Sequence, residues 1–175
     1  MEENSKKIWE RFYNRYSRPL WFYIYKICGD KNMADDIFQE SFCRFLRANP
    51  FILNENHMKS YLYKIAFRII IDKKRRKKVE KRAFEEEKRE FKESKHQEGQ
   101  ESEILFFLDM ENTFKLLKPR ERTLLWLAYV EGYSHEEIAE ITETKKTSIK
   151  VQLFRARKEL VNLLKQKEYK EGVEI

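Results

Sequence analysis

Between residues 132 and 160, apolar positions recur at the three- and four-residue spacing of helices, in two segments joined by a short turn. Ser134, followed three residues later by Glu137, predicts a capping box at the start of the first helix. A polar break over residues 142–145 separates it from a longer helix. In that longer helix the apolar residues fall three and four positions apart and predict one buried stripe: Ile149, Leu153, Ala156, Leu160 and Leu164.

The other faces of this longer helix carry mostly cations: Lys146, Lys150, Phe154, Arg155, Arg157 and Lys158. A short capped helix, a brief turn and a long helix with a basic face are typical of a helix-turn-helix that reads DNA. An ordinary antiparallel helix pair with a solvated basic face fits the same pattern, so both interpretations stay open at this point.

Residues 5–29 and 31–48 also have helical periodicity. In the first segment the spacing indicates core packing rather than stacking on bases, at Phe12, Tyr16, Leu20, Tyr23, Ile24 and Ile27. Pro19 is expected to kink or split this helix, Gly29 to end it, and Asp30 to cap the next one. The second segment has one apolar side, made of Met33, Ile37, Ser41, Phe42 and Phe45.

The opposite side of residues 31–48 is what we call the acidic patch: Asp35, Asp36, Gln39 and Glu40. Glu40 and Arg44 have the spacing of an i,i+4 ion pair, which is a purely local explanation for part of it. The functional interpretation is a docking face for a basic partner. Acid–base catalysis is not supported, because the patch has no glycine-rich loop, no nearby histidine and no metal-ligand partner.

A loop is predicted over residues 49–59 from its proline and asparagine content. The helix expected over residues 60–76 buries Leu62, Ile65, Ala66, Ile69 and Ile70. Six consecutive cations follow at 73–78. The helix dipole explains the first of them, whereas phosphate contact explains the whole run better. Rings on the same helix suit single-stranded nucleic acid: Tyr61, Tyr63 and Phe67.

Residues 79–103 have mixed charge and scattered apolar positions, and we interpret them as an interdomain linker. A second helical domain is expected from residue 104, with a helix that begins near Pro119 and is closed by Gly132. The chain has 175 residues but only four Gly and three Pro, which favours helices over a turn-rich β fold. The predicted fold class is therefore all-α, with two small helical domains joined by a charged linker.

The net charge of +7 favours a polyanionic partner such as nucleic acid. Cys28 and Cys43 lack metal-ligand spacing and are expected to be reduced and partly buried in a cytosolic protein. The start of the chain has no signal-peptide pattern, and no apolar run is long enough to span a bilayer, so a cytoplasmic location without membrane insertion is expected.

Two sets of motifs resemble conserved regions of bacterial sigma-70 family RNA polymerase sigma factors. The first set, similar to region 2, is ADDIFQESF at 34–42, YLYKIA at 61–66 and Ile71-Asp72. The second set, similar to region 4, is LKPRER at 117–122, YVEGYSHEEIA at 129–139 and RARKEL at 155–160. A chain with only these two regions and a charged linker resembles the extracytoplasmic-function (ECF) group.

The resemblance implies a sigma factor that binds core RNA polymerase and directs promoter-specific initiation, without catalytic residues, cofactor or metal. It implies a region 2 domain over 5–78, a linker over 79–103, a region 4 domain over 104–166 and a tail over 167–175. Asp36, Gln39 and Glu40 match the positions that dock the clamp helices of the largest polymerase subunit. Region 4 is expected to contact the flap region, and an anti-sigma factor is a further candidate partner.

The resemblance also implies DNA contacts. Residues 49–59 correspond to the segment that receives a base flipped out of the −10 element, which helps to offset the cost of unpairing. The expected −10 contacts are Asn54, Tyr61, Tyr63, Lys64, Phe67, Arg68, Arg75 and Arg76. The expected −35 contacts in the major groove are Lys146, Lys150, Val151, Phe154, Arg155 and Lys158.

The sequence departs from the family pattern at three places. Phe67-Arg68 stands where the family usually has Arg-Asn, which changes the expected −10 contacts. Glu143 and Thr144 replace a turn glycine and an apolar residue, so the turn is expected to be rebuilt rather than merely strained, since a left-handed non-glycine residue costs roughly 1 kcal/mol. Val151-Gln152 replaces Ser-Arg and leaves fewer donors for DNA, which predicts a different promoter sequence or more reliance on phosphates.

Two other functions remain to be distinguished. A stand-alone helix-turn-helix regulator would bind duplex DNA without polymerase, but it would have no use for the acidic patch or for a base-capture loop. A nucleic-acid-processing enzyme would need a metal-binding cluster of carboxylates.

Overall fold

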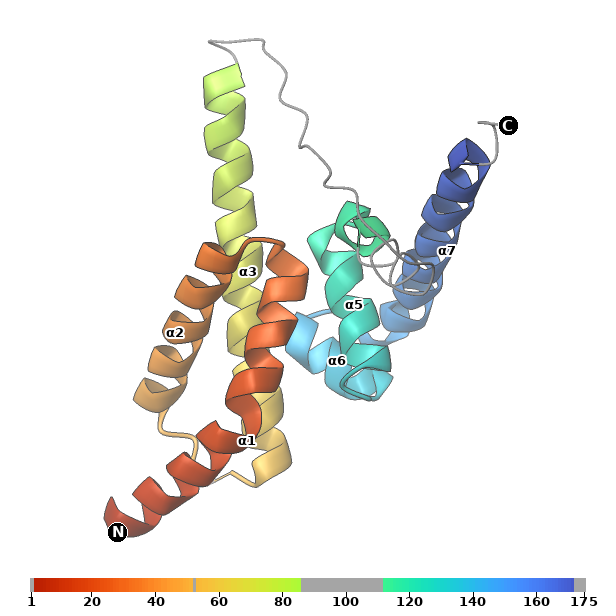
Figure 1. Cartoon of the computed structure of the whole chain (residues 1–175). Coiled ribbons are helices and arrows are strands. Elements are labelled where there is room, and N and C mark those ends of the chain that lie inside the picture. Colours follow the sequence, from red (N-terminus) through yellow and green to blue (C-terminus); the bar gives the residue numbers. More distant parts are fainter. Residues whose placement is uncertain (1, 52, 86–111, 172–175) are drawn as a thin grey trace.

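The computed structural model describes residues 2–51, 53–85 and 112–171, and the regular elements in these ranges are all helices. They are α1 (Glu2–Cys28), α2 (Lys31–Ala48), α3 (Glu55–Glu85), α5 (Pro119–Tyr129), α6 (His135–Thr142) and α7 (Lys146–Glu171). Residues 112–116 form a further helical stretch before α5. The all-α prediction is confirmed. Figure 1 shows α1, α2 and α3 gathered on one side and α5, α6 and α7 on the other.

The first group of helices packs around the stripes that periodicity predicts. All six expected core residues of α1 and all five of α2 are buried, as are the five on α3. Pro19 lies inside α1, which continues past it, so the split that the sequence allowed does not occur. Gly29 ends α1 with φ of +72°, and the Asp30 side chain caps α2 by accepting from the Met33 N–H at 2.7 Å.

Two boundaries of α3 differ from the sequence prediction. The helix begins at Glu55, because the Asn54 side chain caps it by accepting from the His57 N–H at 3.0 Å. The loop between α2 and α3 is therefore shorter than the expected 49–59. The helix also continues to Glu85, so the cations at 73–78 lie within it and residues 79–85 of the expected linker are helical. The helix dipole consequently does not explain these cations. Residues 86–103 of that linker lie outside the described residues.

The second group has its core where the sequence places it. Leu124, Leu125 and Leu127 of α5 are buried together with Ile138 and Ile141 of α6. The buried stripe of α7 is made of Ile149, Leu153 and Ala156, whereas its expected continuation at Leu160 and Leu164 is only half-buried. Helix α7 therefore packs through its first half.

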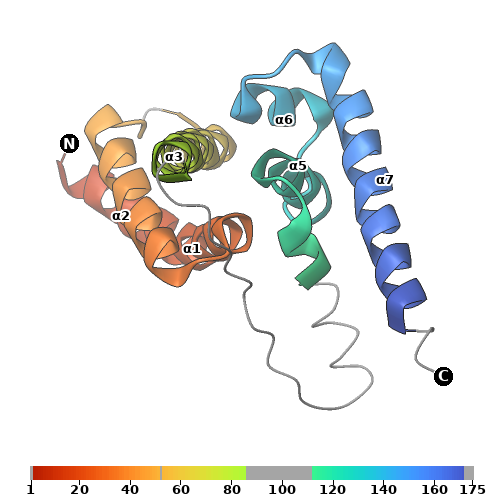
Figure 2. The same cartoon turned by 90° about the horizontal axis from the view of Figure 1, so that it is seen from above.

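The two groups of helices pack against each other, mainly through contacts of α3 with α6 and of α1 with α5. Seen from above in Figure 2, α5 and α6 lie between the first group and α7, which is on the far side. Cys28 is buried and Cys43 is exposed, so the expectation of partial burial is wrong for both, and both thiols are free. Within the described ranges, none of the helices is long and apolar enough to span a bilayer.

Candidate nucleic-acid interface

Helices α6 and α7 form a capped helix-turn-helix. The Ser134 hydroxyl accepts from the Glu137 N–H at 3.3 Å, and the Glu137 carboxylate accepts from the Ser134 N–H at 2.8 Å. This is the capping box that the sequence predicts, and it satisfies two backbone donors at the start of α6. Helix α7 then begins at Lys146, four residues after α6 ends.

The turn between the two helices keeps a left-handed residue although that residue is not glycine. Glu143 has φ of 52° and ψ of 41°, and the Thr144 N–H donates to the Ala139 carbonyl at 2.9 Å. The Thr142 hydroxyl donates to the Ile138 carbonyl at 2.7 Å and lies 3.2 Å from the Thr144 hydroxyl. The turn is therefore not rebuilt; it accepts a cost of roughly 1 kcal/mol and is held by threonine hydrogen bonds.

The residues expected to read the −35 element lie together on an exposed face. Val151 is 48% exposed and Phe154 is 58% exposed, although both are apolar. Lys150, Arg155 and Lys158 are exposed cations of the same helix. Lys146 hydrogen-bonds Glu136, which lowers the pKa of that carboxyl. The start of α7 thus presents cations and apolar groups to solvent, next to the turn.

The expected −10 residues of α3 are placed differently. Spacings of three and four residues put Tyr63, Lys64, Phe67 and Arg68 on one side of the helix, together with Lys59, and we call these five residues the covered face of α3. Tyr63 has no exposed surface and Phe67 is 5% exposed. The structure brings these residues together, but turns that side of α3 toward the second group of helices.

The Lys59 side chain is surrounded by residues of both groups of helices. Its Nζ lies 3.0 Å from Oε2 of Glu131, and both side chains are largely buried. The rings of Tyr133, Tyr63 and Tyr16 surround the ammonium group, with centroids at 4.9, 5.7 and 5.9 Å. A cation next to several ring faces is stabilised by their quadrupoles. Burial raises the pKa values of Tyr63 and Tyr133, so both phenols are neutral at physiological pH.

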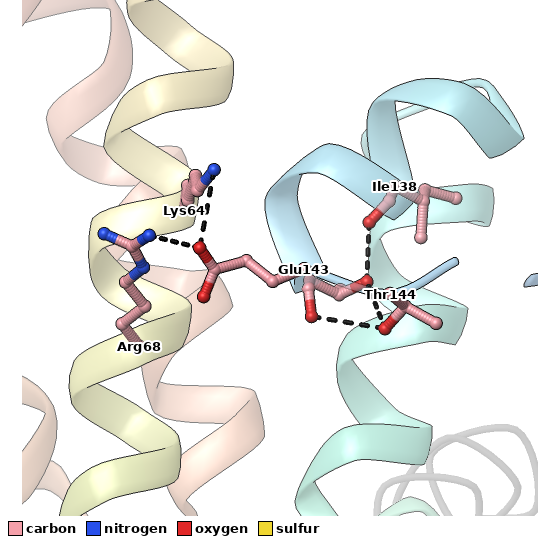
Figure 3. A network of polar contacts seen from close by, with 6 residues as sticks. Lys64, Arg68, Ile138, Glu143 and Thr144 are labelled. Atoms are coloured by element: carbon pink, nitrogen blue, oxygen red, sulfur yellow. Dashed lines mark hydrogen bonds and ion pairs between the residues drawn. The ribbon is translucent and has the colours of Figure 1, made fainter. Parts of the chain in front are cut away.

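Glu143 makes another polar contact between the groups. In Figure 3 its side chain leaves the turn and points to α3, where the carboxylate lies beside Lys64 and Arg68. The Lys64 Nζ is 3.6 Å from Oε1, and Arg68 donates to the same oxygen. The Arg68 hydrogen bond is the main cause that lowers the pKa of Glu143.

The remaining −10 candidates lie at the two ends of α3. Near its start, a cavity of about 230 Å³ is lined by residues that include Arg11, Phe51 and Asn54. Tyr61 is half-buried, with its ring centroid 6.2 Å from that of Phe45. Farther along, Arg75 and Arg76 are exposed and lie about two turns beyond Arg68.

The acidic patch remains on the surface. Gln39 is exposed, and Asp36 is also exposed, with its carboxylate 3.5 Å from Lys73 of α3. Glu40 forms the expected pair with Arg44 at 2.5 Å. Asp35 has a structural use as well, because its carboxylate accepts from the Trp21 indole. No group of three or more metal-ligating side chains is found in the part of the chain that the structure describes.

Sequence reasoning missed several residues of the contact between the groups. Lys59 was expected in a loop and Tyr16 only in a core, whereas Glu131 and Tyr133 attracted notice only as parts of a motif. One signal is visible in retrospect. Glu131, Tyr133 and Glu143 are acidic or aromatic residues beside the helix-turn-helix of a basic chain, where they would not assist phosphate binding.

Two helical groups, one ending in a helix-turn-helix with an exposed second helix and the other carrying cations and rings along α3, define a two-part nucleic-acid-binding protein. The comparisons refine this class. Residues 12–80 match the family model described as "Sigma-70 region 2", and residues 108–160 match "Sigma-70, region 4". The chain belongs to the sigma-70 family of RNA polymerase sigma factors, in the ECF group.

The relatives agree with this membership. The chain is 34% identical over 139 residues to "RNA polymerase sigma factor SigV" of Bacillus subtilis, covering 78% of this chain and 80% of that one. It is 27% identical over 155 residues to "ECF RNA polymerase sigma factor SigW" of the same species, covering 83% and 82%. The solved sigma factor RpoE of Bartonella quintana, in complex with the anti-sigma factor NepR, has a similar fold, with a TM-score of 0.70, 20% identity and coverage of 91% and 98%.

As a sigma factor, the protein binds core RNA polymerase and directs promoter-specific transcription initiation by recognising −35 and −10 elements. It is an initiation factor rather than an enzyme. The match to region 2 does not favour the alternative of a stand-alone helix-turn-helix regulator.

Proposed function

We propose a specific division of labour between the two groups of helices, here called region 2 (α1–α3) and region 4 (α5–α7). The start of α7 reads the −35 element, the covered face of α3 and the loop before it bind the −10 element, and the acidic patch docks polymerase. The observation that carries the proposal is the exposed set of cations and apolar side chains on α7, directly after a capped helix-turn-helix. Such a helix fits the major groove through its N-terminal residues.

The chemistry at the start of α7 suits base reading. Lys150 and Arg155 are donors that suit guanine O6 and N7, and exposed Val151 and Phe154 suit thymine methyl groups. The ring of Phe154 is 58% exposed, although exposing an apolar ring to water brings no stabilisation. Contact with a thymine methyl would explain why a ring stands at this position. Lys146 and Lys158 lie at the ends of this face, where phosphates flank the groove.

Region 2 carries cations and aromatic rings that suit a single DNA strand of the opened −10 element. Cations and rings alternate along the covered face of α3, and rings on which bases stack are the usual platform for single strands. The cavity beside Asn54 combines a ring, an amide and the Arg11 cation, which suits a base that has left the stack. Arg75 and Arg76 continue the basic surface beyond the covered face and suit the DNA backbone.

Polymerase contact is assigned to the acidic patch through Asp36, Gln39 and Glu40, which face solvent fully or in part, as docking to the clamp helices requires. Region 4 is assigned to the flap region. An anti-sigma protein is a further partner, by analogy with the Bartonella quintana complex. We therefore propose that the protein acts in the cytoplasm, where these partners are found.

Run-off transcription tests this function. The purified protein is added to core polymerase with fragments of the source genome, and transcript starts are mapped. We expect new transcripts that depend on the protein and whose starts share two upstream elements. Transcripts that share no such elements, or that also form with core polymerase alone, would contradict the proposal.

A further inference from the structure

Region 4 covers the same face of α3 that is assigned to the −10 element. We propose that this contact is autoinhibitory: in the free protein Glu131 and Glu143 occupy the cations that promoter phosphates require, while Tyr133 covers the ring of Tyr63. The inference rests on the assignment of α3 to −10 binding and adds a regulatory state to it. In that state the −35 helix is accessible and the −10 face is not.

The contact replaces phosphates by carboxylates of the same chain. Two turns of region 4, one on each side of α6, each contribute one carboxylate, and together these engage Lys59, Lys64 and Arg68. A carboxylate is a charge-assisted acceptor for the same donors that bind a phosphate. DNA and region 4 therefore compete for one set of cations.

The Lys59–Glu131 and Arg68–Glu143 ion pairs contribute unequally to the stability of the closed form. The Lys59 and Glu131 side chains are 20% and 9% exposed, so removing one partner leaves the other charge largely buried and unpaired. The Arg68 and Glu143 side chains are 48% and 45% exposed, and solvent screens that pair. We therefore assign most of the electrostatic closure to Glu131 and a smaller share to Glu143.

The rings are covered along with the charges. The Tyr63 and Tyr133 centroids are 5.9 Å apart, with the rings tilted by 68° in an edge-to-face arrangement. Tyr63 has no exposed surface, because its ring packs on Tyr23 of α1 as well as on Tyr133, and no base can stack on the side that Tyr133 covers. Phe67 is 5% exposed in this arrangement.

Arg122 of α5 is a poorly paired buried cation at the contact between the regions, and its burial limits the stability of the closed form. Its guanidinium is buried against the end of α1, where Nη1 donates to the Lys26 carbonyl across a long 3.4 Å and Nε has no acceptor among the described protein groups. The C-terminal end of α1 attracts a cation, but Lys74 already donates to the Cys28 carbonyl there at 3.0 Å. Burial lowers the pKa of Arg122, so the charged group gains hydration when the regions separate.

The first experiment measures separation of the two regions without DNA or polymerase. Exposed Cys43 and a second thiol introduced by Lys165→Cys on α7 accept a donor and an acceptor dye, while Cys28 is buried. Glu131→Gln should raise the ratio of open to closed molecules about tenfold, and Glu143→Gln about two- to threefold. The control is Glu140→Gln, which makes the same charge change at an exposed residue of α6.

The second experiment measures binding of the unlabelled free protein to a fluorescent single-stranded DNA pool of random sequence. Affinity for a site present only in the open form scales with the open fraction. The Glu131→Gln/Glu143→Gln protein should therefore bind at least about tenfold more tightly than the Glu140→Gln control. Adding Lys64→Gln and Arg68→Gln to the open variant should remove the gain.

The outcomes separate this inference from the proposed function. If the glutamine variants do not lower the energy transfer, the inhibitory contact is wrong, whatever transcription shows. Separation without tighter DNA binding overturns the inhibition. Run-off transcription by holoenzyme carrying Lys64→Gln and Arg68→Gln then shows whether the −10 assignment of these cations fails too: retained initiation would mean that Lys64 and Arg68 do not bind this element.

Discussion

The ammonium group of Lys59 lies 3.0 Å from Oε2 of Glu131, and this largely buried ion pair joins the start of α3 to the turn before α6. The other oxygen of the carboxylate accepts from the Trp126 indole at 3.2 Å. Region 4 thus holds the Glu131 carboxylate in position for a cation of region 2. Apolar side chains of both regions also belong to one buried cluster, and the polar groups at the contact can be changed without altering that cluster.

Arg122→Met should have the opposite effect to the glutamine variants. Replacing a poorly paired buried cation with an apolar side chain of similar length removes a desolvation cost and is often neutral or stabilising. We expect the open fraction to fall, single-stranded DNA binding to weaken and the free energy of unfolding to rise by roughly 1 kcal/mol. Energy transfer between dyes at positions 43 and 165 and thermal unfolding measure these effects. A more open and less stable variant would show that Arg122 holds the regions together.

Acid should weaken the closed form through Glu143. The Arg68 hydrogen bond lowers the pKa of this carboxyl in the closed form, below its ordinary value of 4.5. The stabilisation is therefore complete above that ordinary value and is lost as pH falls through the closed-form pKa, while Lys64 and Arg68 stay charged. The difference in open fraction between wild type and Glu143→Gln should be present near pH 7 and vanish once the pH lies below the lowered pKa that Glu143 has in the closed form. A difference that persists in acid would mean that the charge of Glu143 is not its cause.

The acidic patch should be necessary for polymerase binding and dispensable for folding. Asp36, Gln39 and Glu40 have exposed or half-buried side chains outside the core, so replacing all three with Ala should leave the circular dichroism spectrum unchanged. We expect the variant to lose co-purification with core polymerase. Glu140→Ala/Glu159→Ala, which removes two exposed carboxylates from region 4, is the control for charge. Normal binding by the triple variant would overturn the docking assignment.

Lys150 and Lys158 should separate base reading from phosphate binding. Lys150 lies in the second turn of α7, next to the helix-turn-helix turn, and Lys158 lies about two turns farther along. Lys150→Ala should relax the preference at one or two −35 positions and cost about 1–3 kcal/mol on the best site. Lys158→Ala should weaken all sites alike and reduce the salt slope by about one unit. Holoenzyme binding to randomised −35 elements at two salt concentrations measures both; unchanged preferences for Lys150→Ala would remove it from the readout.

Periodicity was sufficient to predict the parts of the fold that depend on neighbours within one helix. The stripes of α1, α2 and α3 are buried as expected, and Asp30 and Ser134 cap their helices as expected. These features are local, since a cap or a stripe is determined within one or two turns. The boundaries of α3 were less predictable, because Asn54 caps a helix that the proline and asparagine content had concealed.

The contact between the regions could not be predicted from the sequence. A surface that binds phosphates and a surface that binds carboxylates of the same chain need the same cations, so the composition of α3 does not separate them. Glu143 shows the same limit. Its left-handed backbone predicts a cost, but the compensating partner Arg68 lies 75 positions earlier in the chain. Only the three-dimensional structure shows that Glu143 and Arg68 are in contact.

The most direct test of the proposed division of labour is photo-crosslinking in the polymerase–promoter complex. A photoreactive phenylalanine derivative replaces Tyr61 on α3 or Phe154 on α7, with the same replacement of Tyr13 on α1 as the control. We expect the probe at position 61 to mark an unpaired strand of the −10 element, the probe at 154 to mark the −35 duplex, and the control to mark no DNA. Probes at 61 and 154 that mark the same element, or that mark no DNA at all, would contradict the account.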